Sequence, residues 1–414
     1  MKEKRIYLYD ETIDDSFIDE FSNIEKIEIK KEVDKKIIID SNIEIILNKY
    51  NNIIKYINNR CEKIENKFLY YNKELQKLEL SNVKKIRDNF LYHNESLQKI
   101  ELPNVEIIEN NFLYYNEKLQ KIELPQVRKI GSCFLYYNER LQKMNLPNVK
   151  EIGDNFLYHN ESLQKIELPN VQEIRYNFLC YNKELQELYL PQVKEIGSAF
   201  LYNNKKLQKI ELPNVETIEN NFLYNNESLQ KIELPQVKEI GLWFLSNNDK
   251  LQEVELSNVK EIGYGFLFNN ERLQKIELPN VKEIGNAFLY HNESLQEVEL
   301  SNVKKIGNYF LFNNECLKKI ELPNVEIIGS KFLYHNESLQ ELYLPNVKEI
   351  ENGILNNNYS LTKFIAPNLS FFGDKDFFED KNIEFLYIPQ ELCKSFEQLY
   401  EKEKVKTLTK SFVK

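Results

Sequence analysis

Four histidines are the side chains of this sequence best suited to holding a metal ion or moving protons near neutral pH. His93, His159, His291 and His335 are separated by 66, 132 and 44 residues, which are all multiples of 22. In a stack of 22-residue units the four histidines occupy one column, with ~4.8 Å between layers. Even the nearest pair, His291 and His335, is then about 10 Å apart. Zinc–nitrogen bonds measure ~2.1 Å. The spacing therefore predicts no shared metal ion.

Other patterns that carry catalysis are absent from the sequence. It has no glycine-rich phosphate loop, no G-x-S-x-G and no C-x-x-C. Carboxylates recur as regular columns rather than as an isolated pair. The five cysteines stand apart, which argues against a disulfide framework and fits a reducing compartment. We therefore expect a non-enzymatic protein with no catalytic residue, no cofactor and no metal.

The charge pattern excludes two classes of partner. Lys and Arg total 55 against 65 Asp and Glu, a net charge of −10, and both signs are interspersed without a basic stripe. Nucleic acid binding is therefore not predicted. No run approaches 18 apolar residues, so we expect no membrane insertion. Acidic residues precede any apolar segment at the N-terminus, which is unlike a secretory signal. We predict a cytoplasmic protein; the alternative is a cell-surface location reached by leaderless export.

A 22-residue repeat positions all of these side chains. A fixed period of this length is typical of a solenoid, in which one small unit is stacked many times. The prolines show the period most clearly, because every one of the twelve falls in a single column: Pro103, Pro125, Pro147, Pro169, Pro191, Pro213, Pro235, Pro279, Pro323, Pro345, Pro367 and Pro389.

Residues 97–118 illustrate the elements that one repeat predicts. Leu97, Ile100 and Leu102 give the spacing of a short strand with one buried face, whereas Lys99 and Glu101 point to the opposite side. Nine of the eleven glycines occupy the position after the next isoleucine, or after Phe372 in the last repeat, and we expect a turn with positive φ there. The Phe-Leu pair after the turn predicts a helical or 3₁₀ segment on the outer side.

An asparagine closes each outer segment without a break from Asn72 to Asn358. An asparagine side chain bonds backbone groups of turns that are otherwise unpaired when buried. Stacking of the repeats therefore predicts a structural asparagine ladder rather than a ligand site.

The run L-x-x-I-x-L-P-x-V-x-x-I-G-x-x-F-L-x-x-N resembles the BspA-type, or Treponema-type, leucine-rich repeat from about residue 17 to 389. The chain departs from that family in having Phe-Leu for Ala-Phe and asparagine for cysteine. The resemblance implies an α/β solenoid, a right-handed superhelix. Its concave face would carry a parallel sheet of about 17 short strands, and its convex side short helical or 3₁₀ segments.

The repeats define four segments of the chain. Residues 1–66 are expected to form an N-terminal cap with degenerate repeats, whose strands lie around Ile24–Ile29 and Ile53–Asn58. Residues 67–353 hold the regular repeats, and residues 354–389 hold degenerate C-terminal repeats. Residues 390–414 are expected to form a helical cap, because Leu392, Phe396 and Leu399 have helical apolar spacing.

Departures from the repeat pattern mark candidate partner-binding residues. On the strand face, where Lys and Glu columns predominate, Glu-Leu-Tyr occurs twice, at Glu187 and Tyr189 and again at Glu341 and Tyr343. Aromatic residues among charged ones are typical anchors of protein interfaces. A second candidate is an edge at which Leu242, Trp243 and Tyr264 replace polar residues; packing between repeats explains this edge equally well.

A third surface is an outer row of aromatic residues two positions after each repeat phenylalanine, for which packing is the first interpretation. We predict a protein-binding scaffold that acts through its concave face or its aromatic edge. The partner is another protein of unknown identity, and self-association is possible. The alternatives are a cell-surface adhesin, which the resemblance implies, and a self-associating structural rod.

Overall fold

The computed structural model describes residues 53–58, 60–350, 353–372, 383–389 and 392, together with the backbone of four strands before residue 53. The chain divides into two compact units, residues 1–212 and 213–414, and each is described by itself.

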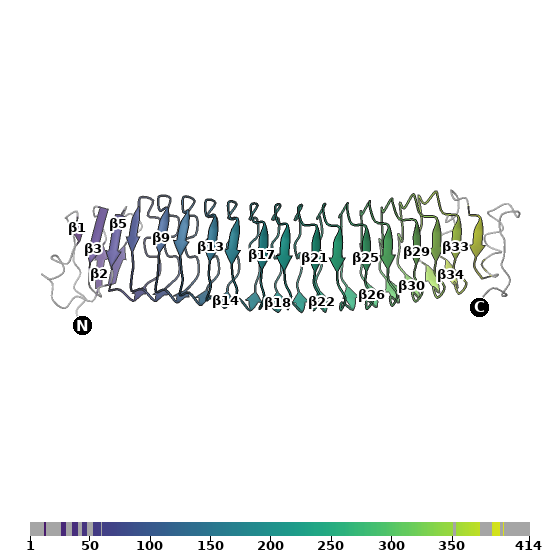
Figure 1. The fold of residues 1–414 in the computed structure, drawn as a ribbon, viewed down its shortest axis with the longest axis horizontal. Helices are drawn as coiled ribbons and strands as arrows, with labels where there is room; N and C mark the ends of the chain where they lie inside the picture. Colours follow the sequence, from purple (N-terminus) through teal and green to yellow (C-terminus); the bar gives the residue numbers. More distant parts are fainter. Residues whose placement is uncertain are drawn as a thin grey trace. The chain divides into compact units, whose positions relative to one another are not determined.

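Every repeat of the first unit contributes two short parallel strands. In β9 (Lys99–Glu101) the L-x-x-I-x-L segment pairs with the next repeat in 22-residue register, with Ile100 opposite Ile122. In β10 (Ile107–Ile108) the isoleucine before the turn pairs in the same way. Figure 1 shows β9, β13 and β17 in one row and the shorter β14 and β18 in another. The longer strands are β5 (Ile53–Asn58), β7 (Lys77–Glu79), β9, β11 (Lys121–Glu123), β13 (Lys143–Asn145), β15 (Lys165–Glu167), β17 (Glu187–Tyr189) and β19 (Lys209–Glu211). The shorter strands are β6 (Lys63–Ile64), β8 (Lys85–Ile86), β10, β12 (Lys129–Ile130), β14 (Glu151–Ile152), β16 (Glu173–Ile174) and β18 (Glu195–Ile196).

The N-terminal strands follow the same alternation with shorter spacing. β1 (Thr12–Ile13), β3 (Lys35–Ile39), β5 and β7 form one parallel sheet, whereas β2 (Lys26–Ile29) pairs with β4 (Glu44–Leu47). The strand expected around Ile24–Ile29 exists, but it does not precede β5 in the sheet; β3 does. The sequence prediction missed β3 because this strand lies 18 or 19 residues before its partners in β5 rather than 22.

The second unit repeats this arrangement. In its longer strands Ile232 lies opposite Val254 and Ile320 opposite Leu342, again in 22-residue register. The longer strands are β21 (Lys231–Glu233), β23 (Glu253–Glu255), β25 (Lys275–Glu277), β27 (Glu297–Glu299), β29 (Lys319–Glu321), β31 (Glu341–Tyr343), β33 (Lys363–Ile365) and β35 (Phe385–Tyr387). The shorter strands are β20 (Thr217–Ile218), β22 (Glu239–Ile240), β24 (Glu261–Ile262), β26 (Glu283–Ile284), β28 (Lys305–Ile306), β30 (Ile327–Ile328), β32 (Glu349–Ile350) and β34 (Phe371–Phe372).

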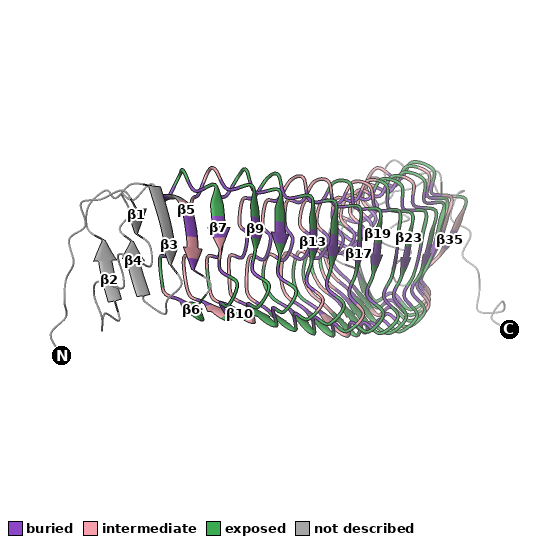
Figure 2. Cartoon of the chain, turned by 60° about the vertical axis from the view of Figure 1, so that its left-hand side comes forward, coloured by how far each residue is buried: buried purple, intermediate pink, exposed green. Residues whose placement is uncertain are grey.

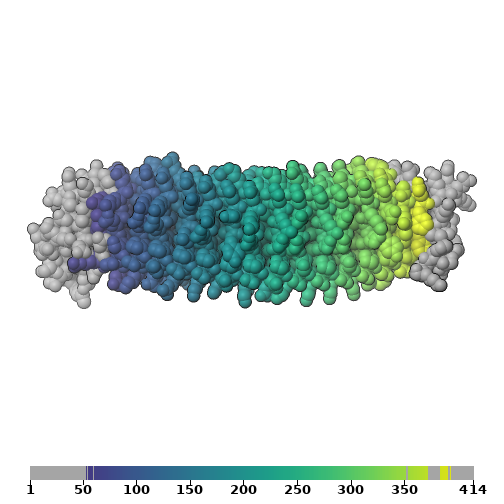
Figure 3. Space-filling model, in the orientation of Figure 1, coloured from purple at the N-terminus to yellow at the C-terminus, as the bar shows by residue number. Residues whose placement is uncertain are grey.

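The core of each repeat lies between its two strands. In β9 the central Ile100 is 1% exposed while Lys99 and Glu101 face solvent, an alternation that Figure 2 shows in colour. Phe112 and its neighbours are fully buried, and the Phe90 and Phe112 rings stack at 5.2 Å. In the space-filling view the side chains of successive repeats follow one another across each unit in sequence order (Figure 3). Each repeat thus buries its apolar residues chiefly against its neighbours.

The convex segment contains no helix between residues 60 and 350, so the predicted helical or 3₁₀ side is wrong for this range. The backbone instead visits positive φ at every second residue, as at Asn111 (56°), Leu113 (52°) and Tyr115 (56°). This alternation points successive N–H groups toward opposite neighbours. The Leu113 N–H donates to Phe90 O of the preceding repeat, whereas the Tyr115 N–H donates to Tyr136 O of the following one. Hydrogen bonds between repeats replace those of a helix.

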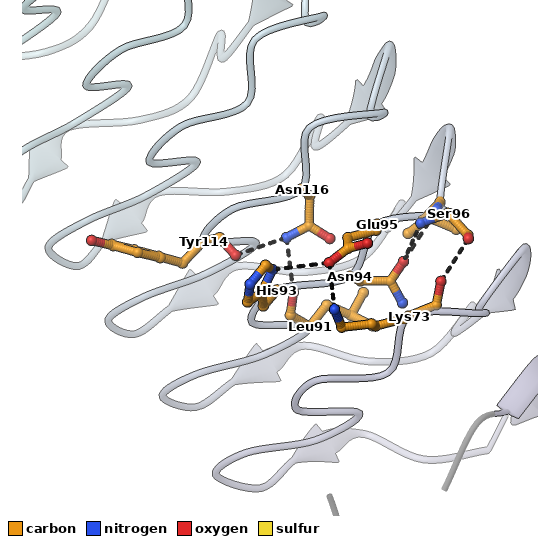
Figure 4. A network of polar contacts seen from close by, with 9 residues as sticks. Lys73, Leu91, His93, Asn94, Glu95, Ser96, Tyr114 and Asn116 are labelled. Atoms are coloured by element: carbon orange, nitrogen blue, oxygen red, sulfur yellow. Dashed lines mark hydrogen bonds and ion pairs between the residues drawn. The ribbon is translucent and has the colours of Figure 1, made fainter. Parts of the chain in front are cut away.

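The asparagine ladder is confirmed by the structure. Asn116 is fully buried, and its Nδ2 donates to Leu91 O at 2.8 Å in the preceding repeat and to Tyr114 O at 3.2 Å (Figure 4). Asn94 caps its own turn, with its Oδ1 accepting from the Ser96 N–H at 3.2 Å. These bonds satisfy backbone groups that would otherwise be buried unpaired.

Two sequence predictions about the extent of the solenoid need separate statements. The count of about 17 strands is not confirmed, because the repeats make about 14 turns and each of them carries two strands. The C-terminal helical cap around Leu392, Phe396 and Leu399 lies almost wholly outside the described residues. In the part of the chain that the structure describes, no helix has the length and hydropathy to cross a bilayer.

Candidate functional site

The longer strands present two columns of opposite charge to solvent. Within β11, Lys121 Nζ lies 2.5 Å from Glu123 Oε1, and within β15 the Lys165–Glu167 pair measures 2.8 Å. About half of each of these side chains remains exposed. Exposed pairs of this kind contribute about 0–1 kcal/mol each. Most of this face is therefore a solvated lattice of ion pairs.

A hollow of about 350 Å³ interrupts that lattice in the first unit. It is centred on β17, the strand in which Glu187 and Tyr189 replace the usual Lys and Glu. Its lining comes from three neighbouring strands and the proline that ends one of them: Lys165, Ile166, Glu167, Leu168, Pro169, Glu187, Leu188, Tyr189, Lys209 and Glu211. We call this the Tyr189 hollow.

Tyr189 and Glu187 differ from their neighbours in having no polar partner. Lys165 and Lys209 are held by Glu167 at 2.8 Å and by Glu211 at 2.5 Å. Those hydrogen bonds raise the pKa of both lysines, and the nearby charge of Glu187 raises it further. Glu187 itself forms no ion pair within the described chain, and the Tyr189 side chain, 53% exposed, has no hydrogen bond or ring contact there.

The second unit contains a smaller hollow of about 230 Å³ around β31. Glu341 and Tyr343 line it together with Lys319, Glu321, Leu342, Lys363 and Ile365. Tyr343 is 39% exposed. Glu341 differs from Glu187 because it pairs with Lys363 at 3.3 Å. The structure thus places both predicted Glu-Leu-Tyr strands in hollows of the charged face.

Elsewhere on the second unit's charged face, a single lysine forms ion pairs with several carboxylates. Lys231 Nζ lies 2.9–3.0 Å from carboxylate oxygens of Glu233, Glu253 and Glu255. The hydrogen bonds that the Lys231 ammonium donates to these carboxylates, the bond to Glu253 first, raise the pKa of Lys231. Lys275 occupies the same position among Glu277, Glu297 and Glu299.

The predicted edge around Trp243 is a packed aromatic cluster with exposed margins. The Trp243 indole lies 4.8 Å from the Tyr264 ring and 5.5 Å from the Phe268 ring. Leu242 and Tyr264 are 44% and 41% exposed, whereas Trp243 is half-buried. The three predicted edge residues therefore lie together, and the interpretation of packing between repeats has direct support.

Two small residues beside Trp243 depart from the repeat pattern, and they explain why the indole fits. Ser246 stands where the outer aromatic row would have a ring, and Trp243 lies between Tyr224 and Phe268 on either side of that gap. Gly265 follows in the next repeat, at φ +72°, and an added Cβ there would come within 2.6 Å of the indole. The Ser246 hydroxyl donates to Gly265 O at 2.8 Å. A small residue on each side therefore makes room for the large one.

The convex side of the first unit carries two adjacent rows of stacked rings, which we call the aromatic double row. In one row Tyr92 and Tyr114 stack at 4.8 Å, and in the other Tyr115 and Tyr137 also stack at 4.8 Å. Most of these rings are half-buried. The rows consist of Tyr70, Tyr92, Tyr114, Tyr136 and Tyr158, and of Tyr71, His93, Tyr115, Tyr137, His159 and Tyr181.

The histidines belong to these packing surfaces. His93 lies between Tyr71 and Tyr115, at 5.2 and 5.7 Å from their rings, and His291 Nδ1 lies 3.0 Å from Asn313 Nδ2. Figure 4 shows His93 beside Glu95, which Lys73 also binds at 2.8 Å. No three metal-ligating side chains come together among the residues described here. Cys61, Cys133, Cys180 and Cys316 are free thiols.

Sequence reasoning missed most of the residues that line the Tyr189 hollow. Lys165 and Lys209 match the ordinary repeat pattern, so they carry no signal of their own. Their positions 22 residues before and after Glu187 do contain the information, because parallel register places such residues side by side. The close packing of Gly265 against Trp243 also had a signal, since glycine otherwise stands in that column only at Gly353.

Comparisons with known proteins place the fold among leucine-rich repeats. A protein of Bacteroides ovatus, solved as a leucine-rich repeat protein, aligns with 94% of this chain and 93% of its own at 17% identity and a TM-score of 0.56. A leucine-rich cell surface protein of Faecalibacterium prausnitzii is 18% identical over 70% of this chain and 92% of its own, with a TM-score of 0.42. A leucine-rich repeat protein of Eubacterium ventriosum is 21% identical over 75% of this chain and 82% of its own, with a TM-score of 0.44.

No curated protein matches the sequence. The BspA type leucine-rich repeat region matches residues 62–186, 172–296 and 282–406, which together cover most of the chain. The protein therefore belongs to the BspA-type leucine-rich repeat family.

Proposed function

We propose that this protein is a non-enzymatic scaffold that binds another protein through its charged strand face, with the Tyr189 hollow as the principal contact. One observation carries the proposal: both Glu-Leu-Tyr strands coincide with hollows in an otherwise regular face. Interface hot spots are aromatic or arginine residues near the centre of a contact, surrounded by groups that exclude water. Tyr189 has this setting, with the exposed Pro169 in the same hollow and the ion pairs Lys165–Glu167 and Lys209–Glu211 on the neighbouring strands.

The strand around Tyr189 offers a conservative test. The double substitution Glu187→Lys and Tyr189→Glu restores the Lys-Leu-Glu sequence that β7 already has. We expect the variant to fold like the parent and to lose most of its affinity for the partner, about tenfold or more, as for removal of an aromatic hot spot. Affinity capture from the source organism followed by titration of the retained protein measures this.

The matched control exchanges an ordinary pair. Lys121→Glu with Glu123→Lys keeps the net charge and lies outside the hollow. The control is expected to bind like the parent. A partner that binds the Glu187→Lys/Tyr189→Glu variant as tightly as it binds the parent would remove the hollow from the proposal.

Self-association through the aromatic double row is a second candidate function. The observation in its favour is that half-buried rings line the convex side of the first unit, whereas the second unit has asparagine at Asn225, Asn247 and Asn269 in the same column. Replacement of Tyr71, Tyr115 and Tyr137 by asparagine therefore introduces a residue that already occurs in this column. Sedimentation over a range of concentrations distinguishes the cases: growth in mass that the variant abolishes supports assembly, and a monomer at high concentration excludes it.

The cellular location remains a prediction. The sequence favours the cytoplasm, and the alternatives are export without a leader and an adhesin role. Protease added to intact cells separates them, because a surface protein is cleaved and an internal one is protected.

A further inference from the structure

The charges around the Tyr189 hollow do not balance. Three carboxylates and two ammonium groups line it, and two of the carboxylates are engaged by the lysines of their own strands. The carboxylate of Glu187 is left without an ion pair in the described chain. The lining therefore retains one negative charge that a guest of charge +1 would neutralise.

The aromatic ring lies beside that charge. Tyr189 is two residues from Glu187 on the same exposed edge of β17, and it is opposite Glu211 in the neighbouring strand. A cation over an aromatic ring is attracted by the ring's negative face, and more strongly where water is partly excluded. An anion placed here would instead meet carboxylates on both neighbouring strands.

The base of the hollow has one exposed apolar side chain, that of Pro169. Ile166, Leu168 and Leu188 also reach the lining but are at most 5% exposed. A small polar cation gains nothing from such a surface, whereas a long aliphatic stem covers it and keeps its charged head at the rim. The combination of an exposed apolar side chain at the base, an aromatic wall and one unpaired carboxylate is the chemistry that recognises a long basic side chain.

We propose that the Tyr189 hollow binds an arginine side chain that projects from the partner protein, an inference that rests on the proposed function. The guanidinium lies over the Tyr189 ring and pairs with Glu187, and the methylene stem covers Pro169. Arginine fits better than lysine because its planar head stacks on a ring and still donates hydrogen bonds to a carboxylate at its edge.

A peptide selection tests this without knowledge of the natural partner. A phage-displayed library of random nonapeptides is selected on the full chain and counter-selected on the Glu187→Lys/Tyr189→Glu variant. We expect the surviving peptides to share an arginine. Replacing that arginine by citrulline, which is neutral and of similar shape, is expected to weaken the dissociation constant about tenfold.

A second substitution isolates the charge of the site. Glu187→Gln removes the ion pair but keeps the contact of the cation with the Tyr189 ring, so it is expected to weaken the arginine peptide by less than the citrulline exchange does and to leave the citrulline peptide unchanged. The Lys121→Glu/Glu123→Lys control is expected to bind both peptides like the parent.

The outcomes separate this inference from the proposed function. Surviving peptides that carry leucine or phenylalanine in place of arginine would overturn the arginine site and leave the hollow as a recognition site. A selection in which every peptide that binds the parent also binds the Glu187→Lys/Tyr189→Glu variant, so that none survives the counter-selection, would overturn both. Equal affinity of the arginine and citrulline peptides would show that the charge of Glu187 has no part in binding.

Discussion

Trp243 and Gly265 fit each other across two neighbouring repeats, and this fit can be tested at single residues. Gly265→Ala places a Cβ about 2.6 Å from the indole at φ +72°. Alanine at positive φ costs about 1 kcal/mol, and overpacking adds about 1–3 kcal/mol. We expect a clear fall in the urea midpoint and a shift in the fluorescence of Trp243, the only tryptophan of the chain.

Gly353 provides the matched control for this prediction. It has the same φ of +72°, but among the described residues an added Cβ there meets only Lys331 Cγ, at 3.8 Å. Gly353→Ala should therefore show the backbone cost without the overlap. Gly265→Ala should lose more stability than Gly353→Ala, and this excess should disappear when Trp243→Ala is combined with Gly265→Ala. Equal losses in Gly265→Ala and Gly353→Ala would show that the ring contact contributes nothing.

Single residues also show where sequence reasoning chose the wrong physical cause. The glycine after each repeat isoleucine was expected to allow positive φ, yet Gly131 does not have it. An added Cβ on Gly131 would lie 2.7–2.9 Å from Asn110 and the backbone of Glu109 in the preceding repeat. Glycine is needed at this position because neighbouring repeats approach too closely to leave room for a Cβ atom. A pattern within one repeat does not reveal the distance to the next one.

At the scale of the element, the aromatic double row makes the first unit sensitive to alkali. Burial, with the neighbouring phenols, raises the pKa of Tyr114 and of Tyr158 from 10.0 to about 12. Unfolded chains lose these protons near pH 10, whereas the folded row keeps them to about pH 12. The contribution of these two phenols to the free energy of unfolding is therefore complete below pH 10 and is lost as the pH rises toward 12.

Removal of the two phenols should flatten that pH dependence. The Tyr114→Phe/Tyr158→Phe variant keeps the stacked rings but has no proton to lose at these positions. We expect urea midpoints close to those of the parent at pH 7 and 9, and a smaller fall than the parent's between pH 10 and 12. Parallel curves for the two proteins above pH 10 would contradict the assignment.

The elements themselves were predictable in proportion to their periodicity. The longer strands follow from alternation such as Lys99-Ile100-Glu101, and the register follows from the repeat length. The shorter strands escaped prediction because β10 has two residues and one buried side chain, too few to show a period. Phe-Leu reads as helical by propensity, but the segment forms hydrogen bonds between repeats through alternating φ.

For the whole molecule, the repeat length was the most informative property of the sequence. It predicted stacking, the asparagine ladder and the position of the Glu-Leu-Tyr strands on one face. It did not predict which departures form hollows, because a hollow depends on three strands together. Lys165 and Lys209 border the Tyr189 hollow although each belongs to a regular repeat.

Stacking of near-identical repeats predicts that one whole unit can be removed. Deleting residues 121–142 joins Gln120 to Lys143, and every column then continues in register. Because each repeat contacts mainly its neighbours, we expect a folded protein with the parent's circular dichroism spectrum. Its urea m-value should fall only in proportion to the surface removed, and the Tyr189 hollow should keep its ligand.

Deleting residues 121–131 is the matched test of register. It removes half as many residues but joins Gln120 to Ser132, which puts Ser-Cys-Phe where the strand needs Lys-Ile-Glu. The shortened repeat at the junction then cannot place its apolar residues on the buried face opposite those of its neighbours, as in a slipped strand. We expect loss of cooperative unfolding or aggregation from the shorter deletion and not from the longer one. If both deletions unfold alike, stability depends on contacts beyond neighbouring repeats, and the nearest-neighbour account of this solenoid is wrong.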